Sequence, residues 1–370
     1  MTSENHCLGS CLNAQPTHCY DMLTRSRSQF YQVTSAFRRF ELDVGMPLND
    51  HQGRQHRLYG EMSGNPEGPV VLCLHGGPGA GSNPATRQFF DPDHYCIVQF
   101  DQRGAGRSQP WASMEQNTTD HLVEDIEHIA KELQLDRFIL FGGSWGSTLA
   151  LAYAGRYPER VTAMVLRGIF LGRPRDVEWF LMGLEGVHPE AHAAFVAHLD
   201  AAEQTDAKSI LAAYTRRLMS SDRHVSLAAA KAWSSYEDAA ATLRDNRERK
   251  YQMTQFDCAR RGIRRRATGE QKTNSSVLAI ARCEAHYLSN NLFLPSQGLL
   301  ACAQRWQHVP GTIVHGRYDM VCQVQGAYEL AKAWPKAELK IVDDAGHSTF
   351  EDSIADQLLG TMEKMKSLDI

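Results

Sequence analysis

Residues 138–150 read FILFGGSWGSTLA, and the rest of the chain can be placed around them. An apolar run leads into Gly142 and Gly143, then Ser144 and one more glycine, and a helix-forming segment follows. This order is typical of a strand, a sharp turn and a helix, with Ser144 at the apex. Glycine at 142 and 146 suits the turn, because side chains there would crowd a strained serine. An ordinary turn with a capping serine has the same pattern, so the other motifs must decide.

The composition describes a globular chain with no strong preference for anionic partners. Its 370 residues are 42% hydrophobic, which is enough for one large core with an insertion or for two domains. The net charge of −4 favours neither nucleic acid nor an acidic membrane surface, and no apolar run is long enough to span a membrane. We therefore expect neither nucleic acid nor membrane among its partners.

Residues 1–35 are polar and irregular, which predicts a poorly ordered N-terminal extension. They lack the apolar core of a secretory signal. The nine cysteines have scattered spacing that matches no zinc pattern and fits a reducing compartment. We expect a cytoplasmic protein without a bound metal. Arg25 and Arg27, among several serines, leave mitochondrial targeting open as the alternative.

Strand-like and helix-like segments alternate over most of the chain. Continuous apolar runs, typical of buried parallel strands, occur at 70–74, 95–100, 138–141, 163–167, 312–314 and 339–342. Helical patterns occur at 119–133, 327–333 and 353–366. The alternation predicts an α/β fold, a mostly parallel sheet flanked by helices.

Strand signals stop between Phe170 and Arg305. We therefore expect an α/β domain made of residues 36–169 and 306–370, interrupted by a helical cap domain at 170–305. An insertion after the end of a strand lies over the crevice where open α/β sheets bind ligands. Within the cap, residues 244–272 are dense in Arg and Lys, and we expect this part to form a solvated surface loop that ends near residue 276. A nucleic-acid contact by this stretch is the disfavoured alternative.

Ser144 needs a base to activate it, and the base needs an acid to orient it. Asp319 lies just beyond the strand at 312–314, and His347 lies just beyond the strand at 339–342. Parallel strands end at one sheet edge, so all three side chains are expected together. The chain order Ser, Asp, His is also the order of strand–turn–helix hydrolases. We predict Ser144 as the nucleophile, His347 as its base and Asp319 as the acid that orients His347.

Other residues compete for these roles. His75, His286 and His315 are rival bases, and a structural role is favoured for His75 because it precedes a glycine loop. Asp343 and Asp344 are rival acids, but they lie too close to His347 along the chain to reach it from a neighbouring strand.

An acyl intermediate also needs two backbone donors for its oxyanion. The amide of Trp145, directly after the nucleophile, is one candidate. The second is expected from the loop HGGPG at 75–79, with Gly77 favoured. A phosphate cradle is disfavoured for this loop because no Lys-Ser/Thr pair follows the glycines.

Five motifs in this order resemble those of prolyl iminopeptidases, serine peptidases with an α/β-hydrolase fold. They are HGGPG at 75–79, DQRGAGRS at 101–108, GGSWGSTL at 142–149, GRYD at 316–319 and AGHS at 345–348. The similarity spans about residues 38–366. It implies an α/β-hydrolase fold with a helical cap, and release of N-terminal proline from short peptides through an acyl-enzyme. It implies no metal and no cofactor.

The resemblance also implies a pocket in the cap. Glu237 and Glu284 would bind the free imino group, and Phe170, Trp179 and the ring of Trp145 would surround the pyrrolidine ring. The sequence supports the glutamates independently, because each lies on the apolar stripe of a predicted helix, where an unpaired carboxylate is costly. A cationic substrate would be a suitable partner for them. An ion pair with an internal arginine such as Arg282 remains the alternative.

The chain departs from the family pattern at three places near this pocket. Tyr236 stands where tryptophan is usual, residues 283–286 read CEAH, and Gln323 stands where proline is usual. These changes leave open a broader aminopeptidase, an amidase or an esterase of the same fold. A non-catalytic binding protein is the alternative of a different class, although such proteins typically lose the serine or the histidine. The oligomeric state is left open.

Overall fold

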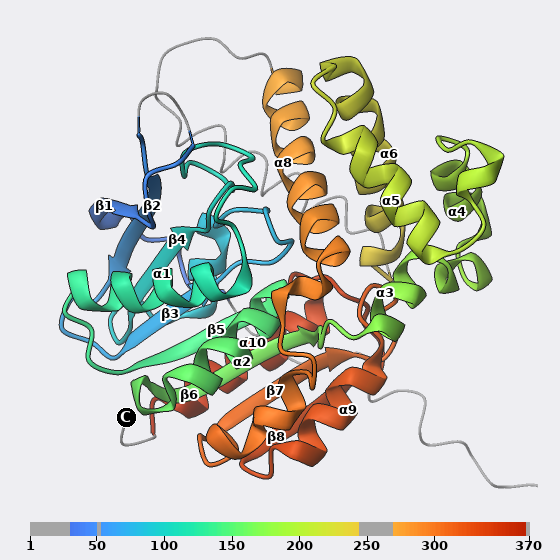
Figure 1. Ribbon diagram of the computed structural model, residues 1–370. Coiled ribbons are helices and arrows are strands. Elements are labelled where there is room, and N and C mark those ends of the chain that lie inside the picture. Colours follow the sequence, from blue (N-terminus) through green and yellow to red (C-terminus); the bar gives the residue numbers. More distant parts are fainter. Residues whose placement is uncertain (1–29, 50–52, 244–268, 368–370) are drawn as a thin grey trace, which may run out of the picture.

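One eight-stranded sheet crosses the molecule, in the order β1-β2-β4-β3-β5-β6-β7-β8 (Figure 1). The computed structural model describes residues 30–49, 53–243 and 269–367. Strands β1 and β2 are antiparallel to each other, β2 is antiparallel to β4, and all pairs from β4 to β8 are parallel. The strands are β1 Ala36–Val44, β2 His56–Gly64, β3 Val70–Leu74, β4 Cys96–Asp101, β5 Phe138–Ser144, β6 Val161–Ile169, β7 Gly311–Gly316 and β8 Ala337–Val342.

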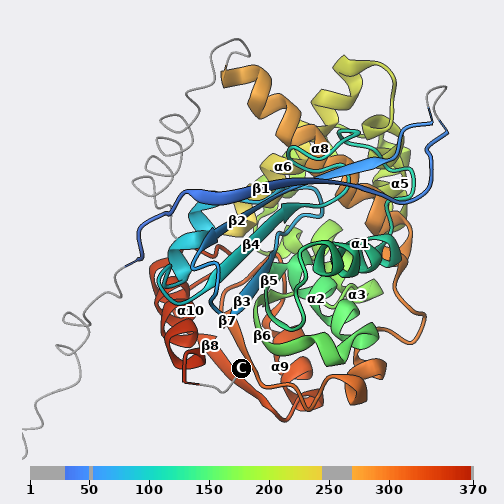
Figure 2. The same cartoon turned by 90° about the vertical axis from the view of Figure 1, so that its left-hand side faces the viewer.

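Helices cover both faces of this sheet (Figure 2). Helices α1 (Thr119–Glu132), α2 (Trp145–Arg156) and α9 (Val324–Ala333) share one apolar core with the first face. Helix α10 (Asp352–Met365) and the short 3-10 helix η1 (Pro84–Phe89) share a second core with the other face. Because both faces are covered, β4 is buried along its whole length, as its continuous apolar sequence predicts. The predicted α/β sheet is confirmed.

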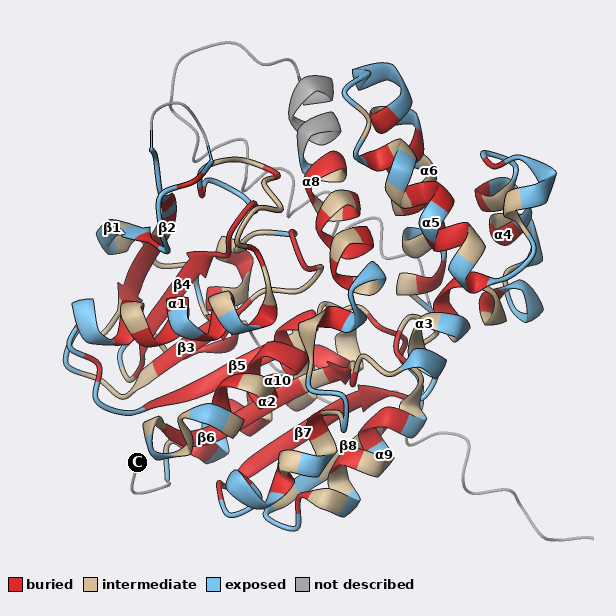
Figure 3. Cartoon of the chain, in the orientation of Figure 1, coloured by how far each residue is buried: buried red, intermediate tan, exposed pale blue. Residues whose placement is uncertain are grey.

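Between β6 and β7, the described residues form helices and irregular structure, with no strand. The α-helices are α3 Pro174–Leu181, α4 Pro189–Val196, α5 Ala207–Leu218, α6 Arg223–Ala241 and α8 Gly269–Ser289. They enclose a third apolar core of their own around the fully buried Trp233. Figure 3 shows the buried residues gathered along the facing sides of α5, α6 and α8. The remaining 3-10 turns are η2 Pro158–Arg160, η3 Gly183–Gly186, η4 Ala201–Glu203, η5 Asn291–Phe293 and η6 Leu299–Arg305.

Two segments expected to be irregular are partly ordered. Residues 1–29 lie outside the described part, but Phe30 packs its ring on Phe89 with centroids 5.5 Å apart, and the Tyr31 amide donates to the Gln88 carbonyl at 3.1 Å. Most of the basic stretch at 244–272 also lies outside the described part. Its end does not form the predicted loop, because α8 begins at Gly269 and packs against α5 and α6.

None of the helices in the described ranges combines the length and the apolar character needed to cross a membrane.

Candidate active site

Ser144 lies at the turn where β5 ends and α2 begins. Its φ of 58° and ψ of −128° are values that residues with side chains rarely adopt. A side chain on Gly142 would overlap the backbone of Gly146, and one on Gly146 would overlap the carbonyl of Leu74. The two glycines therefore allow the turn to close, and the turn holds Ser144 at the C-terminal edge of the sheet.

His347 and Asp319 form a buried pair at the same edge. The Nδ1 of His347 lies 2.8 Å from Oδ2 of Asp319, while the other carboxylate oxygen accepts the amide N–H of Cys322 at 2.7 Å. Burial opposes ionisation of Asp319, but His347, His315 and the Cys322 amide outweigh it and hold the pKa of Asp319 below its ordinary value. The carboxylate is thus a pure acceptor, so Nδ1 of His347 carries the proton and Nε2 is left as the basic nitrogen.

The ring of His347 lies over β6, the strand beside Ser144. A Cβ added to Gly168 would lie 3.0 Å from Cε1 of His347, and the next residue, Ile169, is paired in register with Ser144. Within the described residues no hydrogen bond joins His347 to Ser144, and Nε2 lies 3.3 Å from Nη1 of Arg167. Catalytic hydrogen bonds often align only when substrate is bound, so this arrangement is compatible with a base and its nucleophile.

Two rival histidines are engaged elsewhere. The fully buried His315 accepts the Ile169 amide at Nδ1, and its Nε2 donates to the Cys322 carbonyl at 2.8 Å. His75 accepts the amide of Gln102 at Nε2. Burial lowers the pKa of both rings. Both rings are thus engaged in hydrogen bonds with the backbone, whereas His347 lies over β6, the strand beside Ser144.

Two backbone segments next to Ser144 offer amide donors. Trp145 is the first residue of α2, so its N–H has no partner within the helix. On the other side, Gly77 and Pro78 border the same cavity as Ser144, and a Cβ added to Gly76 would lie 3.4 Å from Cβ of Ser144. The loop after β3 therefore lies beside Ser144, and its role as the source of a second oxyanion donor stays a prediction.

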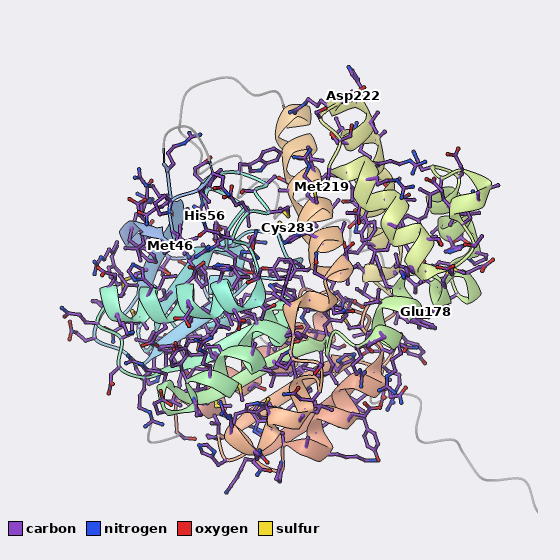
Figure 4. The ribbon with its side chains drawn as sticks, viewed as in Figure 1. Met46, His56, Glu178, Met219, Asp222 and Cys283 are labelled. Carbon is purple, nitrogen blue, oxygen red and sulfur yellow. The ribbon has the colours of Figure 1, made fainter. Side chains whose placement is uncertain are left out.

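Helix α8 packs directly on this loop. Figure 4 shows Cys283 on α8, and a Cβ added to Gly79 would lie 3.0 Å from its sulfur atom. Gly79 thus permits a close approach between the loop and the helix. The next residue of α8, Glu284, borders the cavity at Ser144.

This cavity, of about 40 Å³, lies between the sheet edge and the helices that follow β6. Apolar side chains from α3, α8 and the segment after β7 form most of its wall. The carboxyl groups of Glu237 and Glu284 border it from α6 and α8, and Asp176 of α3, which is paired with Arg173 at 2.8 Å, borders it as well. Its lining residues are Gly77, Pro78, Ser144, Phe170, Asp176, Val177, Phe180, Glu237, Glu284, Tyr287, Leu288, Leu292, Val321 and Cys322. The structure therefore brings the predicted Phe170, Glu237 and Glu284 together with Ser144.

The carboxyl groups of Glu237 and Glu284 are hydrogen-bonded to each other and not to an arginine. Glu237 and Glu284 share a hydrogen bond, and the indole N–H of Trp233 donates to Glu284 at 2.6 Å. Arg282, the alternative partner, instead donates to the carbonyl of Leu218 at 2.7 Å. Among the described residues, no Lys, Arg or His forms an ion pair with either carboxyl.

Burial and mutual repulsion hold protons on this pair. Burial, together with the charge of Asp238, raises the pKa of Glu237 to about 7. Burial and the charge of Glu237 raise the pKa of Glu284 well above its ordinary value. At neutral pH the pair therefore retains at least one proton, and it is suited to receive a cation.

Helix α3 presents other residues to the cavity than expected. Val177 and Phe180, three positions apart, face it, whereas Trp179 does not border it and donates its indole N–H to the Met320 carbonyl at 2.7 Å. The expected contact of Trp179 with substrate is thus not supported, because the rotation of α3 turns this side chain away.

The ring of Trp145 is also absent from the described wall of the cavity. It is fully buried, its N–H donates to the Gln102 side chain at 2.9 Å, and it packs edge-on against Tyr287 with centroids 4.7 Å apart. Tyr287 borders the cavity in its place. The backbone of Trp145 still adjoins Ser144, while its ring supports the pocket from behind.

Comparison with known proteins agrees with this arrangement. A family model described as the alpha/beta hydrolase fold matches residues 69–354. A proline iminopeptidase of Xylella fastidiosa is 47% identical over 306 residues, which cover 82% of this chain and 91% of that protein. The chain belongs to the proline iminopeptidase family. The family's Arabidopsis thaliana member is 45% identical over 315 residues, which cover 85% of this chain and 78% of that protein.

Solved structures of low sequence identity resemble this proline iminopeptidase family member in fold. An alpha/beta hydrolase enzyme from a Medee basin deep-sea metagenome library aligns with a TM-score of 0.54 and 15% identity, over 86% of this chain and 98% of that one. The predicted fold class and the predicted family are both confirmed. Val177, Phe180 and Tyr287 were missed as pocket residues, although Val177 and Phe180 share one face of a helix by their spacing.

Proposed function

We propose that this chain is a serine aminopeptidase that releases N-terminal proline from short peptides. The observation that carries the proposal is the pair Glu237–Glu284, which lies in the cavity of Ser144 and has no cationic partner among the described residues. An N-terminal proline carries a positively charged secondary amine close to its carbonyl carbon. Binding this amine between the carboxyl groups would place the first peptide bond at Ser144. The relatives' name, proline iminopeptidase, supports the same substrate.

In the first half of the reaction, the hydroxyl of Ser144 attacks the carbonyl carbon of the proline residue, and its proton passes to Nε2 of His347. The negative charge on the carbonyl oxygen is stabilised by the amides of Gly77 and Trp145. Asp319 stabilises the imidazolium through the 2.8 Å contact with Nδ1. The carbon–nitrogen bond then breaks, and His347 gives its proton to the amine of the departing peptide.

In the second half, a water molecule attacks the prolyl ester of Ser144. His347 takes a proton from that water and returns it to the serine oxygen, so that free proline leaves and the enzyme is restored. No other co-reactant is needed, because the bond broken and the bond formed balance as a hydrolysis.

Residues 170–305 act in this proposal as a cap that selects the first residue of the peptide. The pyrrolidine ring would lie against Phe170, Val177 and Phe180, and the cap would prevent a chain from continuing beyond the amine. A free N-terminal amine supplies a positive charge to Glu237 and Glu284 next to the first peptide bond, and an acylated N-terminus does not. The cap therefore makes the enzyme an aminopeptidase, and its apolar wall favours a compact ring.

The test compares three substrates with the purified chain: a proline arylamide, an alanine arylamide and an aryl acetate. We expect the proline arylamide to be hydrolysed with the highest kcat/KM, and N-acetylation of its amine to abolish turnover. Hydrolysis of the acetate without either amide would support the esterase alternative and overturn the proposal. Binding of prolyl peptides without hydrolysis of any substrate would support the non-catalytic alternative.

A further inference from the structure

A second, larger cavity lies on the other side of the Ser144 turn. Its volume is about 190 Å³, against about 40 Å³ for the cavity that holds the glutamates. Gly76 and Gly143 border the second cavity, whereas the residues that directly follow them, Gly77 and Ser144, border the first. A Cβ added to Gly76 would lie 3.9 Å from Oγ of Ser144, so the two cavities adjoin at the backbone beside the nucleophile.

The second cavity lies next to the loop that carries His347. Thr349, two residues after His347, borders it, and so does Arg167, whose Nη1 donates to the His347 carbonyl at 2.6 Å. In the proposed reaction His347 hands its proton to the departing amine. The peptide that leaves must therefore extend toward His347, away from the glutamates.

The charge in this cavity comes from Arg167. Its guanidinium lies directly against the backbone of Gly143, and its Nε is buried without a hydrogen-bond partner in the described part of the chain. Burial lowers the pKa of Arg167, and the charges of Asp319 and Glu351 oppose this only in part; within the described residues neither carboxylate forms an ion pair with Arg167. A half-buried cation with a buried, unpaired donor atom is stabilised by a bound anion.

Further donors face the same space. The Oδ1 of Asn83 accepts the amide of Ala85 at 2.9 Å, which directs its NH₂ group away from that contact. Within the described residues, that NH₂ group and the hydroxyls of Thr86 and Thr349 have no hydrogen-bond partner, and all three residues border the cavity. The wall thus offers donors to a ligand rich in acceptors.

From these observations we infer that the second cavity binds the departing part of the substrate, and that Arg167 pairs with the free α-carboxylate of the residue after proline. This inference rests on the proposed function. One residue spans at most about 3.6 Å, so only a dipeptide places its carboxylate beside the scissile bond, where the guanidinium lies against Gly143. The preferred substrates are therefore dipeptides of the form Pro-Xaa.

The experiment measures kcat/KM for Pro-Ala and for Pro-Ala amide, which differ only in the carboxylate, with the proline arylamide as a third substrate. For the wild type we expect kcat/KM for Pro-Ala to be about tenfold or more above that for its amide. This factor corresponds to the usual free-energy contribution of a charge-assisted hydrogen bond. In Arg167→Gln the ratio should approach one. The result is judged by the ratio of kcat/KM for Pro-Ala to kcat/KM for its amide, because losing the contact between Arg167 and His347 should lower the rates for all three substrates.

A second variant keeps the test valid if Arg167→Gln does not fold. Asn83→Asp keeps the oxygen that caps η1 but adds a negative charge to the cavity, so it should lower the ratio at least tenfold. Gln304→Glu adds the same charge at an exposed position of η6 and should leave the ratio unchanged. A wild-type ratio near one, or an equal fall for all substrates in Asn83→Asp, would overturn the inference. If the wild type cleaves no proline substrate at all, the proposed function itself fails.

Discussion

Replacing Glu237 by glutamine should increase the thermal stability of the protein and lower its catalytic efficiency toward proline substrates. Glutamine keeps the shape and the hydrogen-bonding capacity of the side chain toward Glu284, but it cannot ionise. Glu237 has a pKa raised from 4.5 to about 7, chiefly by burial. The folded wild type therefore holds this proton more tightly than the unfolded chain does. The contribution of Glu237 to the stability of the wild type therefore falls as pH rises from 4.5 to about 7 and is constant above that.

The magnitude follows from the size of the shift. A rise from 4.5 to about 7 corresponds to at most about 3 kcal/mol of lost stability at pH 8. For a chain of 370 residues, the unfolding entropy converts this loss into about 4 °C in Tm. The difference in Tm between Glu237→Gln and wild type should thus grow by up to about 4 °C between pH 4.5 and pH 8. At pH 8, where Glu237 is ionised in the wild type, kcat/KM for the proline arylamide should be about 10- to 100-fold lower in the variant, and this loss should shrink below pH 7.

The assay is thermal unfolding of both proteins at a series of pH values, paired with kinetics on the proline arylamide and an aryl acetate. Glu178→Gln is the matched control, because Glu178 is exposed on α3 and points away from the cavity (Figure 4). A Tm difference that does not change with pH would show that Glu237 does not titrate as described. Unchanged proline kinetics, or equal losses for amide and ester, would refute its role in binding the amine.

Two other substitutions test the remaining parts of the site. Ser144→Ala should lower kcat by at least about 10⁴-fold without changing the circular dichroism spectrum, and activity near wild type would remove Ser144 from the mechanism. Gly168→Ala places a methyl group 3.0 Å from His347 at a φ of +53°, so it should cost roughly 1–2 kcal/mol of stability and lower kcat more than it changes KM. An unchanged kcat would show that the position of His347 does not depend on this close contact.

The sequence was sufficient for those parts of the site that depend on local backbone chemistry and chain order. The glycines around Ser144 indicate the tight turn, because no larger residue fits against the backbone at 142 and 146. Asp319 and His347 could be placed at the same edge because both follow strands of a parallel sheet, whose ends coincide. The two glutamates could be singled out because a carboxylate on an apolar helix face is costly to bury unless it has a binding partner.

What remained undecided depends on how the helices rotate and pack against one another. The sequence of α3 cannot tell whether Trp179 or the pair Val177 and Phe180 faces the cavity, because this depends on the contact of the helix with the segment after β7. The shared proton of Glu237 and Glu284 depends on two helices that are brought together only by tertiary packing. The same holds for Arg167, since the turn at Gly143 and the loop of His347 meet around its side chain only in the folded sheet. Chain order thus determined which residues lie at the sheet edge, and packing across the edge decided what each of them faces.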